Sequence, residues 1–476
     1  MSKWKMLIGG ELLAAESGKT FPVINPANGE EFDRIPMGCE VEVEHSVAAA
    51  RRAYKEWSQK PMQERAEALK KIGAALRDRH EEIAKIDCLD HGTPIAMARD
   101  YTMEASNEFD RAAAMAQPLG ADALDMGRDG LAYVHRQPIG VCALITPWNV
   151  PLWVAASKIA SALIMGNTCV LKPPSIDSVT SLLLGEIIAN LNDIIPPGVV
   201  NIITGSGEVA GSALASHSNI DMVSFTGSTE AGKSIFTSAG KTIKKLCLEL
   251  GGKNPFIIMK DANIDDAAAV GAQTQTENSG QACISPGRYY VHEEVYDEFI
   301  EKYITELKRV VVGDPLDLNT TMGPVVSEHH RNSIEALVQS SLNEGARLAF
   351  GQLGPLPDPI NRGFYVLPSV ITGVTSNMKV YREEIFGPVA CIIKYSDNDD
   401  VVAMANDNKY GLAASVWTRD IEKGMKMANE IEAGTIWVNT HMGMWGLPMG
   451  GVKESGVGKE EPDAYCEKNS IYVKFS

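Results

Sequence analysis

The chain has 476 residues and a formal net charge of −17, and both numbers limit the classes of protein to which it can belong. Its length suffices for about two or three domains with buried cores. Because an acidic chain repels the phosphates of nucleic acids and of anionic membranes, we expect neither as a partner.

The eight cysteines occur singly, without the CxxC or Cys/His spacings of metal sites. We therefore expect no disulfide framework and no bound metal, and we interpret seven of the eight cysteines as reduced thiols of a cytoplasmic protein. The N-terminus has only a short apolar run, and the longest apolar stretch, residues 150–166, is interrupted by Ser157, Lys158 and Ser161. Neither a signal peptide nor a membrane span is expected.

The predicted elements follow in chain order. Residues 43–57 and 63–86 carry apolar side chains at helical spacing. After Ile139, strand-like runs alternate with helical runs, at 140–148, 156–165, 168–174, 179–191, 199–205 and 221–227. A second series follows Gly252, with strands expected at 254–259, 288–295, 389–395, 413–418 and 434–439. This alternation predicts an α/β fold with parallel sheets. Residues 130–138 and 470–476 read as strands outside both series and could pair with another subunit.

Three residues are candidates for catalysis. Cys283, in ENSGQACISPGR, lies in a turn rich in Gly, Ser and Pro, which suits an exposed nucleophilic thiol. Glu249, in LELGGKNP, ends an apparent strand among apolar residues, where desolvation would raise its pKa towards that of a general base. Asn149, in TPWNVP, could donate to an oxyanion. Each also has a simpler interpretation: a turn cysteine, a salt-bridged glutamate and a turn asparagine.

Two glycine-bearing segments could hold phosphates. GSGEVAG at 205–211 is one residue longer than the dinucleotide fingerprint GxGxxG. FTGSTEAGK at 225–233 follows an apolar strand and opens a helix, whose free N–H groups can hold a pyrophosphate. Lys172, in LKPP, lies at a strand end from which its charge could reach a ribose or a phosphate.

Six segments occur in the same order as in the aldehyde dehydrogenase superfamily: TPWN, FTGSTEAG, LELGGKNP, SGQACISPGR, EEIFGPV and PMGGVKESGVGKE. The chain resembles that superfamily over nearly its whole length. The resemblance implies a Rossmann-like cofactor domain (1–119 and 140–250), an α/β catalytic domain (251–460) and an oligomerisation β-arm (120–139 and 461–476). It also implies a homodimer or homotetramer.

For catalysis, the resemblance implies that Cys283 is the nucleophile and that Asn149, with the backbone N–H of Cys283, forms the oxyanion hole. Glu249 would activate water, and Lys158 and Glu460 resemble a proton-relay pair behind it. The expected reaction converts an aldehyde to a carboxylic acid through a thioester, without a metal.

The implied cofactor is NADP or NAD, held by residues from both series: Trp148, Lys172, Ser175, Gly207, Gly227, Ser228, Glu384 and Phe386. In NAD-restricted members an acid commonly stands three residues after the lysine of LKPP. Because Ser175 occupies that position here, we expect NADP to be accepted, since a hydroxyl can donate to the 2′-phosphate. The alternative is a surface serine and an NAD enzyme.

The segments that resemble the aldehyde channel offer Trp153, Glu277, His441, Met442, Met444, Trp445 and Met449. This set predicts an aromatic or bulky apolar aldehyde, with Glu277 available to a ring hydroxyl. The segments contain no Arg or Lys for a second carboxylate, although Arg99 and Arg111 precede them on a helix. Three alternatives stay open: a cationic aminoaldehyde or betaine aldehyde, acyl transfer to coenzyme A, and a non-catalytic structural protein that kept the fold.

Overall fold

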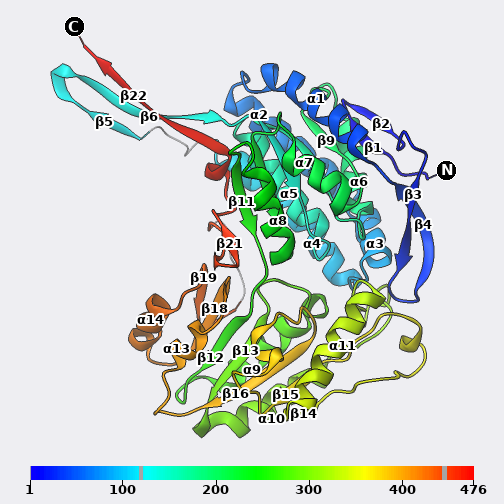
Figure 1. Cartoon of the computed structure of the whole chain (residues 1–476), viewed down its shortest axis with the longest axis vertical. Coiled ribbons are helices and arrows are strands. Elements are labelled where there is room, and N and C mark those ends of the chain that lie inside the picture. Colours follow the sequence, from blue (N-terminus) through cyan, green and yellow to red (C-terminus); the bar gives the residue numbers. More distant parts are fainter. Residues whose placement is uncertain (1, 117–121, 442–446, 476) are drawn as a thin grey trace.

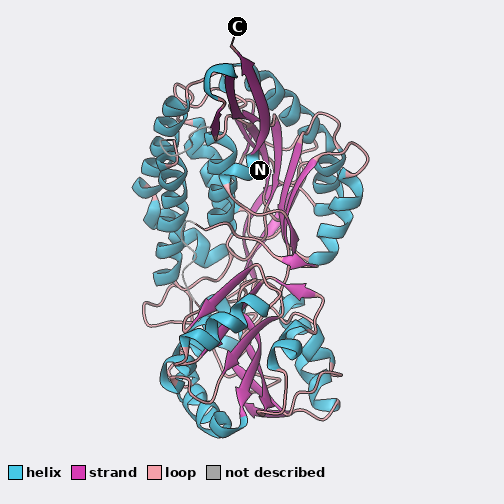
Figure 2. Ribbon diagram, turned by 90° about the vertical axis from the view of Figure 1, so that its left-hand side faces the viewer, coloured by secondary structure: helices cyan, strands magenta, loops and turns pink. Residues whose placement is uncertain are grey.

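The computed structural model describes residues 2–116, 122–441 and 447–475. Within these residues the chain forms two lobes, each built on a mainly parallel sheet, and a β-arm that projects from the first lobe (Figure 1). Helices cover both sides of the strands (Figure 2). The architecture confirms the predicted α/β class.

The first sheet has the strand order β2-β1-β9-β8-β7-β10-β11-β21. Its five central strands are parallel, while β1, β2 and β21 are antiparallel to their neighbours. The bounds are β1 Met6–Ile8, β2 Glu11–Leu13, β7 Val141–Ile145, β8 Thr168–Lys172, β9 Val200–Ile202, β10 Met222–Thr226, β11 Lys245–Glu249 and β21 Gly456–Val457.

Alternation of apolar side chains explains why this sheet is buried on both faces. Along β7, Cys142 and Leu144 pack into one core, whereas Val141, Ala143 and Ile145 pack into another on the opposite face. The covering helices are α1 Glu40–Trp57, α2 Met62–Asp78, α3 His80–Asp90, α4 Ile95–Ala114, α5 Pro151–Ile164, α6 Val179–Ala189, α7 Ser212–Ser216 and α8 Thr229–Ala239.

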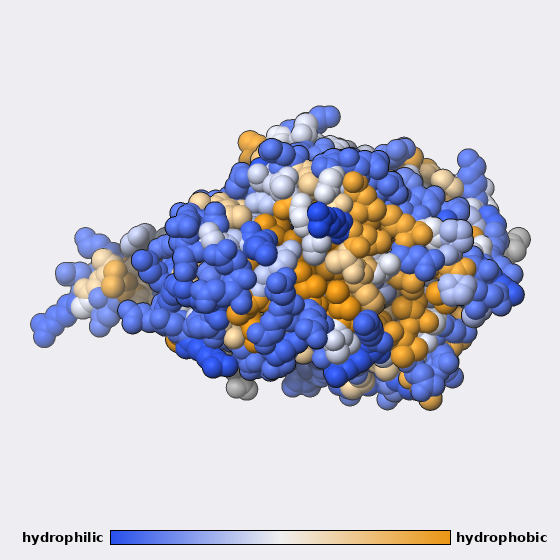
Figure 3. Space-filling view, turned by 90° about the horizontal axis from the view of Figure 1, so that it is seen from below, coloured by the Kyte–Doolittle hydropathy of each residue, from blue (hydrophilic) through white to orange (hydrophobic). Residues whose placement is uncertain are grey.

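The second sheet has the order β14-β15-β16-β13-β12-β18-β19, and only β14 is antiparallel to its neighbour. Its strands are β12 Asn254–Ile258, β13 Pro286–His292, β14 Arg347–Phe350, β15 Ser369–Thr372, β16 Val389–Tyr395, β18 Ala413–Trp417 and β19 Thr435–Val438. The helices around it are α9 Ile264–Thr276, α10 Tyr296–Leu307, α11 Glu328–Asn343, α12 Lys379–Arg382, α13 Val401–Asn406 and α14 Ile421–Glu430. Seen from this end of the molecule, hydrophilic side chains surround an apolar region (Figure 3).

The arm consists of β5 Ala123–Asp125, β6 Gly130–Pro138 and β22 Cys466–Lys474 in an antiparallel sheet. The two strand-like segments that lay outside the sequence series therefore pair with each other, from Pro138↔Cys466 to Gly130↔Lys474. Apolar side chains on the arm are exposed: Leu124 is 67% and Tyr472 is 74% exposed.

Some elements differ from the sequence expectation. The predicted helix over 63–86 is two helices, which meet at Arg79 (φ −107°, ψ 12°). The N-terminal strands β1 and β2, with the hairpin β3 Thr20–Asn25 and β4 Glu30–Pro36, were not predicted, because they are short and irregular in pattern. The small pair β17 Tyr410–Gly411 and β20 Val452–Lys453 completes the strands. None of the described helices is both long and apolar enough to span a membrane.

Candidate functional site

The candidate residues gather between the two sheets because of the strand order. The chain runs from β7 outward through β8 to β9, then returns to place β10 on the other side of β7. Ligands of open parallel sheets bind at the carboxyl ends of the strands beside such a reversal. Asn149 follows β7, Lys172 ends β8, Gly227 follows β10 and Glu249 ends β11. The second sheet adds the segments that precede β13 and β16.

The Cys283 loop has an unusual backbone. Asn278, Ser279 and Gly280 have consecutive positive φ angles of 50°, 56° and 72°, a conformation that costs energy for non-glycine residues. The carbonyl of Cys283 accepts a hydrogen bond of 2.8 Å from Asn254 Nδ2. Burial, followed by the charges of Glu384 and Glu249, raises the pKa of the half-buried Cys283 thiol to about 12. The thiol therefore needs an added positive charge to become a thiolate near pH 7.

Asn149 connects the first lobe to this loop. Its Nδ2 donates to the carbonyl of Gln281 at 2.8 Å, and its own carbonyl accepts from Asn278 Nδ2 at 2.7 Å. The two bonds, one from the side chain and one to the backbone of Asn149, hold its side-chain amide beside the backbone that leads to Cys283. Because an amide NH₂ group has two donors, the bond to Gln281 leaves a second N–H for an oxyanion.

Glu249 lies at the end of β11 and is 4% exposed. Neither carboxyl oxygen has a hydrogen-bond partner among the described residues. Burial, and then the charge of Glu460, raises the pKa of Glu249 to about 9. A carboxyl group with these properties is a proton acceptor whose basicity is high once it is ionised.

Lys158 and Glu460 form a buried ion pair behind Glu249. Lys158 is fully buried, and its Nζ lies 2.7 Å from Glu460 Oε2 and 2.6 Å from Ser224 Oγ. Tyr465 also donates to Glu460. Although burial opposes it, the attraction of Lys158 and these hydrogen bonds lower the pKa of Glu460. The structure thus brings together the two residues that the sequence suggested as a pair.

The candidate phosphate-binding residues surround the ends of β8 and β10. Ser228 caps α8, accepting from Ala231 N, so the first turn of this helix presents its N–H groups at the end of β10. Burial lowers the pKa of Lys172, which is 3% exposed, to about 8. Gly207 opens a short helix, and a Cβ there would meet nothing within 4 Å, which leaves space for a ligand.

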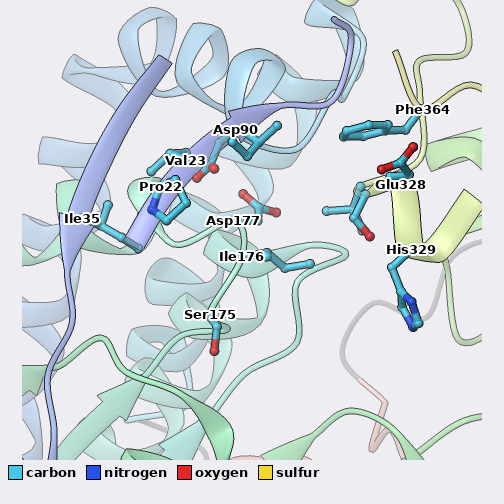
Figure 4. Close-up of a pocket in the computed structure, with 13 residues that line it drawn as sticks. Pro22, Val23, Ile35, Asp90, Ser175, Ile176, Asp177, Glu328, His329 and Phe364 are labelled. Atoms are coloured by element: carbon cyan, nitrogen blue, oxygen red, sulfur yellow. The ribbon is translucent and has the colours of Figure 1, made fainter. Parts of the chain in front are cut away.

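Ser175 lies near Lys172 and donates to the carbonyl of Gly205 at 3.3 Å. It also lines a cavity of about 270 Å³, together with Asp90 and Asp177 (Figure 4). Burial raises the pKa of Asp90 to about 7, and burial together with the charge of Asp90 raises that of Asp177 well above its usual value. None of the residues that line this cavity belongs to the Cys283 loop, although Val326 in its wall donates to Gln281 Oε1 at 2.9 Å.

Trp148 and Phe386 meet across the two lobes, and Glu384 lies two residues before Phe386. The rings of Trp148 and Phe386 have centroids 5.3 Å apart, and Glu384 Oε1 accepts from Gly252 N at 2.8 Å. His330, which sequence reasoning missed, packs its ring against Trp148 and donates from Nε2 to the Phe386 carbonyl at 2.8 Å. Phe386 has a positive φ of 56°, so His330 stabilises a conformation that is unfavourable for the free chain.

Tyr101, a second residue that sequence reasoning missed, contacts both Trp153 and Glu277. Tyr101 from α4 donates to Glu277 Oε1 at 3.4 Å, and its ring centroid is 5.8 Å from that of Trp153. Trp153 Nε1 donates to Glu108 Oε1 at 2.8 Å. Burial raises the pKa of Glu277. Both Tyr101 and Glu108 lie on α4. Because this helix is far in sequence from TPWN and from the Cys283 loop, sequence reasoning did not predict either residue.

The remaining predicted channel residues have different positions. His441 was expected to line the channel, but it is fully buried, and its ring nitrogens contact Ser415 Oγ at 3.1 Å and the Ile284 carbonyl at 2.8 Å. It is a core residue behind the Cys283 loop, and burial lowers its pKa to about 4. Met449 is half-buried and pairs with Glu460 through the backbone. Met442, Met444 and Trp445 lie outside the described residues.

The two arginines considered as anchors for a second carboxylate are already paired. Arg99 contacts Glu81 at 2.8 Å, and Arg111 contacts Glu104 at 3.0 Å and Glu108 at 2.7 Å. All eight cysteines are free thiols, and only Cys39 and Cys283 are not buried. Among the described residues, His292, Glu294 and Asp397 could group around a metal ion, but Lys260 already binds both carboxylates.

The chain is similar to known proteins over almost its whole length. Residues 13–474 match the model of the aldehyde dehydrogenase family. An aldehyde dehydrogenase from Enchytraeus buchholzi is 39% identical, over 99% of this chain and 95% of the relative. The structure of 3,6-anhydro-L-galactose dehydrogenase in complex with NADP superposes with a TM-score of 0.94 at 36% identity, over 99% of each chain. Betaine aldehyde dehydrogenase from Staphylococcus aureus in complex with NAD⁺ gives a TM-score of 0.95 at 32% identity, over 99% of this chain and 95% of that one. The chain therefore belongs to the aldehyde dehydrogenase family and is an aldehyde-oxidising enzyme of that family.

Proposed function

We propose that the chain oxidises an aldehyde to a carboxylic acid, with NADP or NAD, through a thioester on Cys283. One observation carries the proposal: Asn149 and Glu249 come from different elements, and each acts on the loop that holds Cys283. Asn149 bonds to the carbonyl two residues before Cys283, and the charge of Glu249 raises the pKa of the Cys283 thiol.

In the proposed reaction the Cys283 thiol loses its proton to solvent, and the thiolate sulfur adds to the aldehyde carbon to give a thiohemiacetal in its oxyanion form. Asn149 and a backbone N–H hold its oxyanion, and each such donor contributes about 3–4 kcal/mol. When bound, the cofactor would supply the positively charged ring that accepts a hydride from the thiohemiacetal carbon. Loss of the hydride leaves a thioester on Cys283. Glu249 then takes a proton from water, the hydroxide attacks the thioester, and the acid leaves as the thiol is restored.

The proposed cofactor site rests on groups that suit a dinucleotide. The first turn of α8 and the open space at Gly207 fit phosphates, while Trp148 and Phe386 present rings that fit a flat nicotinamide. Ser175 is neutral, and the buried Lys172 lies on the adjoining strand. We therefore propose that NADP is accepted, because no carboxylate at position 175 would repel a 2′-phosphate.

For the substrate we propose an aromatic or bulky apolar aldehyde. The rings of Tyr101 and Trp153 support this assignment, because they lie beside each other and Trp153 is about one turn of helix after Asn149. The paired state of Arg99 and Arg111 argues against a second carboxylate on the substrate. A cationic aldehyde is the second candidate, because Glu277 places a carboxylate beside the same two rings.

Two other reactions are less well supported. Acyl transfer to coenzyme A favours a site without a water-activating base, whereas Glu249 is present and buried at the end of β11. A non-catalytic protein would be free to lose Cys283, Glu249 or Asn149, and the chain retains all three.

Self-association is proposed through the arm, because exposed apolar side chains on β5 and β22 need a partner surface. The proposed domains are the cofactor domain (1–119 and 140–250), the catalytic domain (251–460) and the arm (120–139 and 461–476). The cytoplasmic location stays a prediction.

The decisive experiment is an aldehyde panel with NAD and with NADP, read as absorbance of the reduced cofactor. Benzaldehyde-type substrates should give the highest kcat/KM, ahead of betaine aldehyde and succinate semialdehyde. A clear preference for either of the last two would refute the substrate assignment alone. Release of an acyl-coenzyme A, or no reduction with any aldehyde, would refute the hydrolytic reaction itself.

A further inference from the structure

Lys253 is a buried lysine in the connection between β11 and β12. It is 2% exposed, and its Nζ has no hydrogen-bond partner among the described residues. Burial lowers its pKa. Gly287 makes room for it, since a Cβ there would lie 2.8 Å from Lys253 Cδ. Burying an amine without a hydrogen-bond partner costs free energy. We therefore expect a second group that the charge of Lys253 stabilises.

That group is Glu384, which lines the same small cavity as Lys253. The cavity has a volume of about 20 Å³ and also borders Gly252, Ser285 and Phe386. A buried water needs about 10–15 Å³ and two or more polar partners, so the cavity accepts one water molecule. Burial raises the pKa of Glu384 to about 7, while the bond from Gly252 N and the charge of Lys253 oppose this rise.

The other ionisable groups near the pair do not replace Lys253. Arg288 is as buried as Lys253, but its guanidinium donates to the Lys253 carbonyl at 2.9 Å, the Tyr290 hydroxyl at 3.0 Å and the Ala405 carbonyl at 2.9 Å. The remaining neighbours are acids or neutral groups: Glu383, Cys391, Cys283 and Tyr410. Lys253 is the cation that acts on Glu384.

We propose that a water molecule in this cavity links Lys253 to Glu384, and that Lys253 thereby keeps Glu384 ionised for cofactor binding. The inference rests on the proposed function and on the role that the family resemblance implies for Glu384, which is to hold the cofactor by accepting hydrogen bonds from the hydroxyls of the nicotinamide ribose. A carboxylate accepts two such bonds, whereas a protonated carboxyl is a weaker acceptor. Lys253 is thus a positioning residue that acts through Glu384.

The test is an equilibrium titration of the whole enzyme with NADP and with NAD between pH 6 and pH 9.5, followed by tryptophan fluorescence, because Trp148 lies beside Phe386. In the wild type, affinity should rise with pH through a midpoint near 7. Lys253→Met keeps the length of the side chain and removes the charge. We expect its midpoint about one pH unit higher, with affinity about fivefold weaker at pH 7 and close to wild type at pH 9.

Lys260→Met is the matched control, since Lys260 is an exposed lysine just after β12 that pairs with Asp397, and it should leave the midpoint unchanged. Glu384→Gln should remove the rise in affinity near pH 7, with or without Lys253→Met, and leave only the fall expected around pH 8, where Lys172 loses its charge. An unchanged midpoint in Lys253→Met, or an equal loss of affinity at every pH, would overturn the inference. If Lys253→Met does not fold, a rise in affinity near pH 7 that persists in Glu384→Gln overturns it instead. Absence of cofactor binding by the wild type at any pH would instead refute the proposed function.

Discussion

The strongest quantitative prediction concerns Glu249 and the pH dependence of thioester hydrolysis. Its carboxyl is 4% exposed, lacks a hydrogen-bond partner, and has a pKa raised to about 9 by burial and by Glu460. Only the ionised form can take a proton from water. At pH 7, two units below that pKa, about one molecule in a hundred carries the ionised form. Hydrolysis should therefore rise about tenfold per pH unit until it levels off near pH 9.

The replacement Glu249→Gln keeps the size of the side chain and removes the base. We expect it to lower the hydrolysis rate by about 10²–10⁴-fold where the wild type is fully ionised. The loss should be about a hundredfold smaller at pH 7, because there the wild type itself works with a small ionised fraction. Reduction of the cofactor in the first turnover needs no water, so a burst close to one equivalent should remain.

The assay is stopped-flow absorbance of the reduced cofactor from pH 6 to pH 10, which separates the burst from the steady state. Mass spectrometry of the quenched protein should show an acyl group on Cys283 in Glu249→Gln. The reasoning would fail if the wild-type steady-state rate were flat over this range while the burst stayed fast. It would also fail if Glu249→Gln turned over at the wild-type rate at pH 9.

Two further outcomes are expected. Cys283→Ala should abolish dehydrogenase activity while cofactor affinity, measured by fluorescence, stays within about threefold; residual activity above a few per cent would contradict the thioester route. Ser175→Glu should lower kcat/KM with NADP by about tenfold or more and leave NAD much less affected, because a carboxylate would face the 2′-phosphate; equal losses with both cofactors would mean that Ser175 does not contact that phosphate.

The sequence predicted the positions of the candidate residues best where they lie at strand ends. Glu249 ends β11 and Lys172 ends β8, as the apolar runs before them indicated. Parallel strands bring such ends to one edge of a sheet, so local pattern was enough to group these residues. The pair of Lys158 and Glu460, which are far apart in sequence yet 2.7 Å apart in space, was predicted from family resemblance alone.

Other features depended on tertiary packing, which a local pattern does not encode. Tyr101 and His330 lie on helices without a motif, and they join the site only because α4 and α11 pack against its loops. His441 was misplaced for the same reason: its type suited a channel, but the chain turns it into the core, where both ring nitrogens find partners. The burial of Lys253 likewise depends on space left by Gly287.

The buried ion pair gives a last prediction that separates charge from packing. Both members of the pair act on the pKa of Glu249. The charge of Glu460 raises this pKa, and the charge of Lys158 lowers it by a smaller amount. Glu460→Gln removes the larger influence with little change in shape. The pKa of Glu249 should fall whether Lys158 keeps its proton or loses it, so the rise in hydrolysis should move to lower pH.

Tyr465→Phe is the matched control, because it removes one donor to Glu460 but leaves the charge of Glu460 paired with Lys158. Its midpoint should stay within a few tenths of a pH unit of the wild type. Breaking a buried pair costs about 3–5 kcal/mol of stability, so both variants must be assayed well below their measured Tm. A midpoint in Glu460→Gln that is unchanged or higher would show that the charge of Glu460 does not control the pKa of Glu249. A lower midpoint in Glu460→Gln alone would come from the charge, because a change in packing is common to both variants.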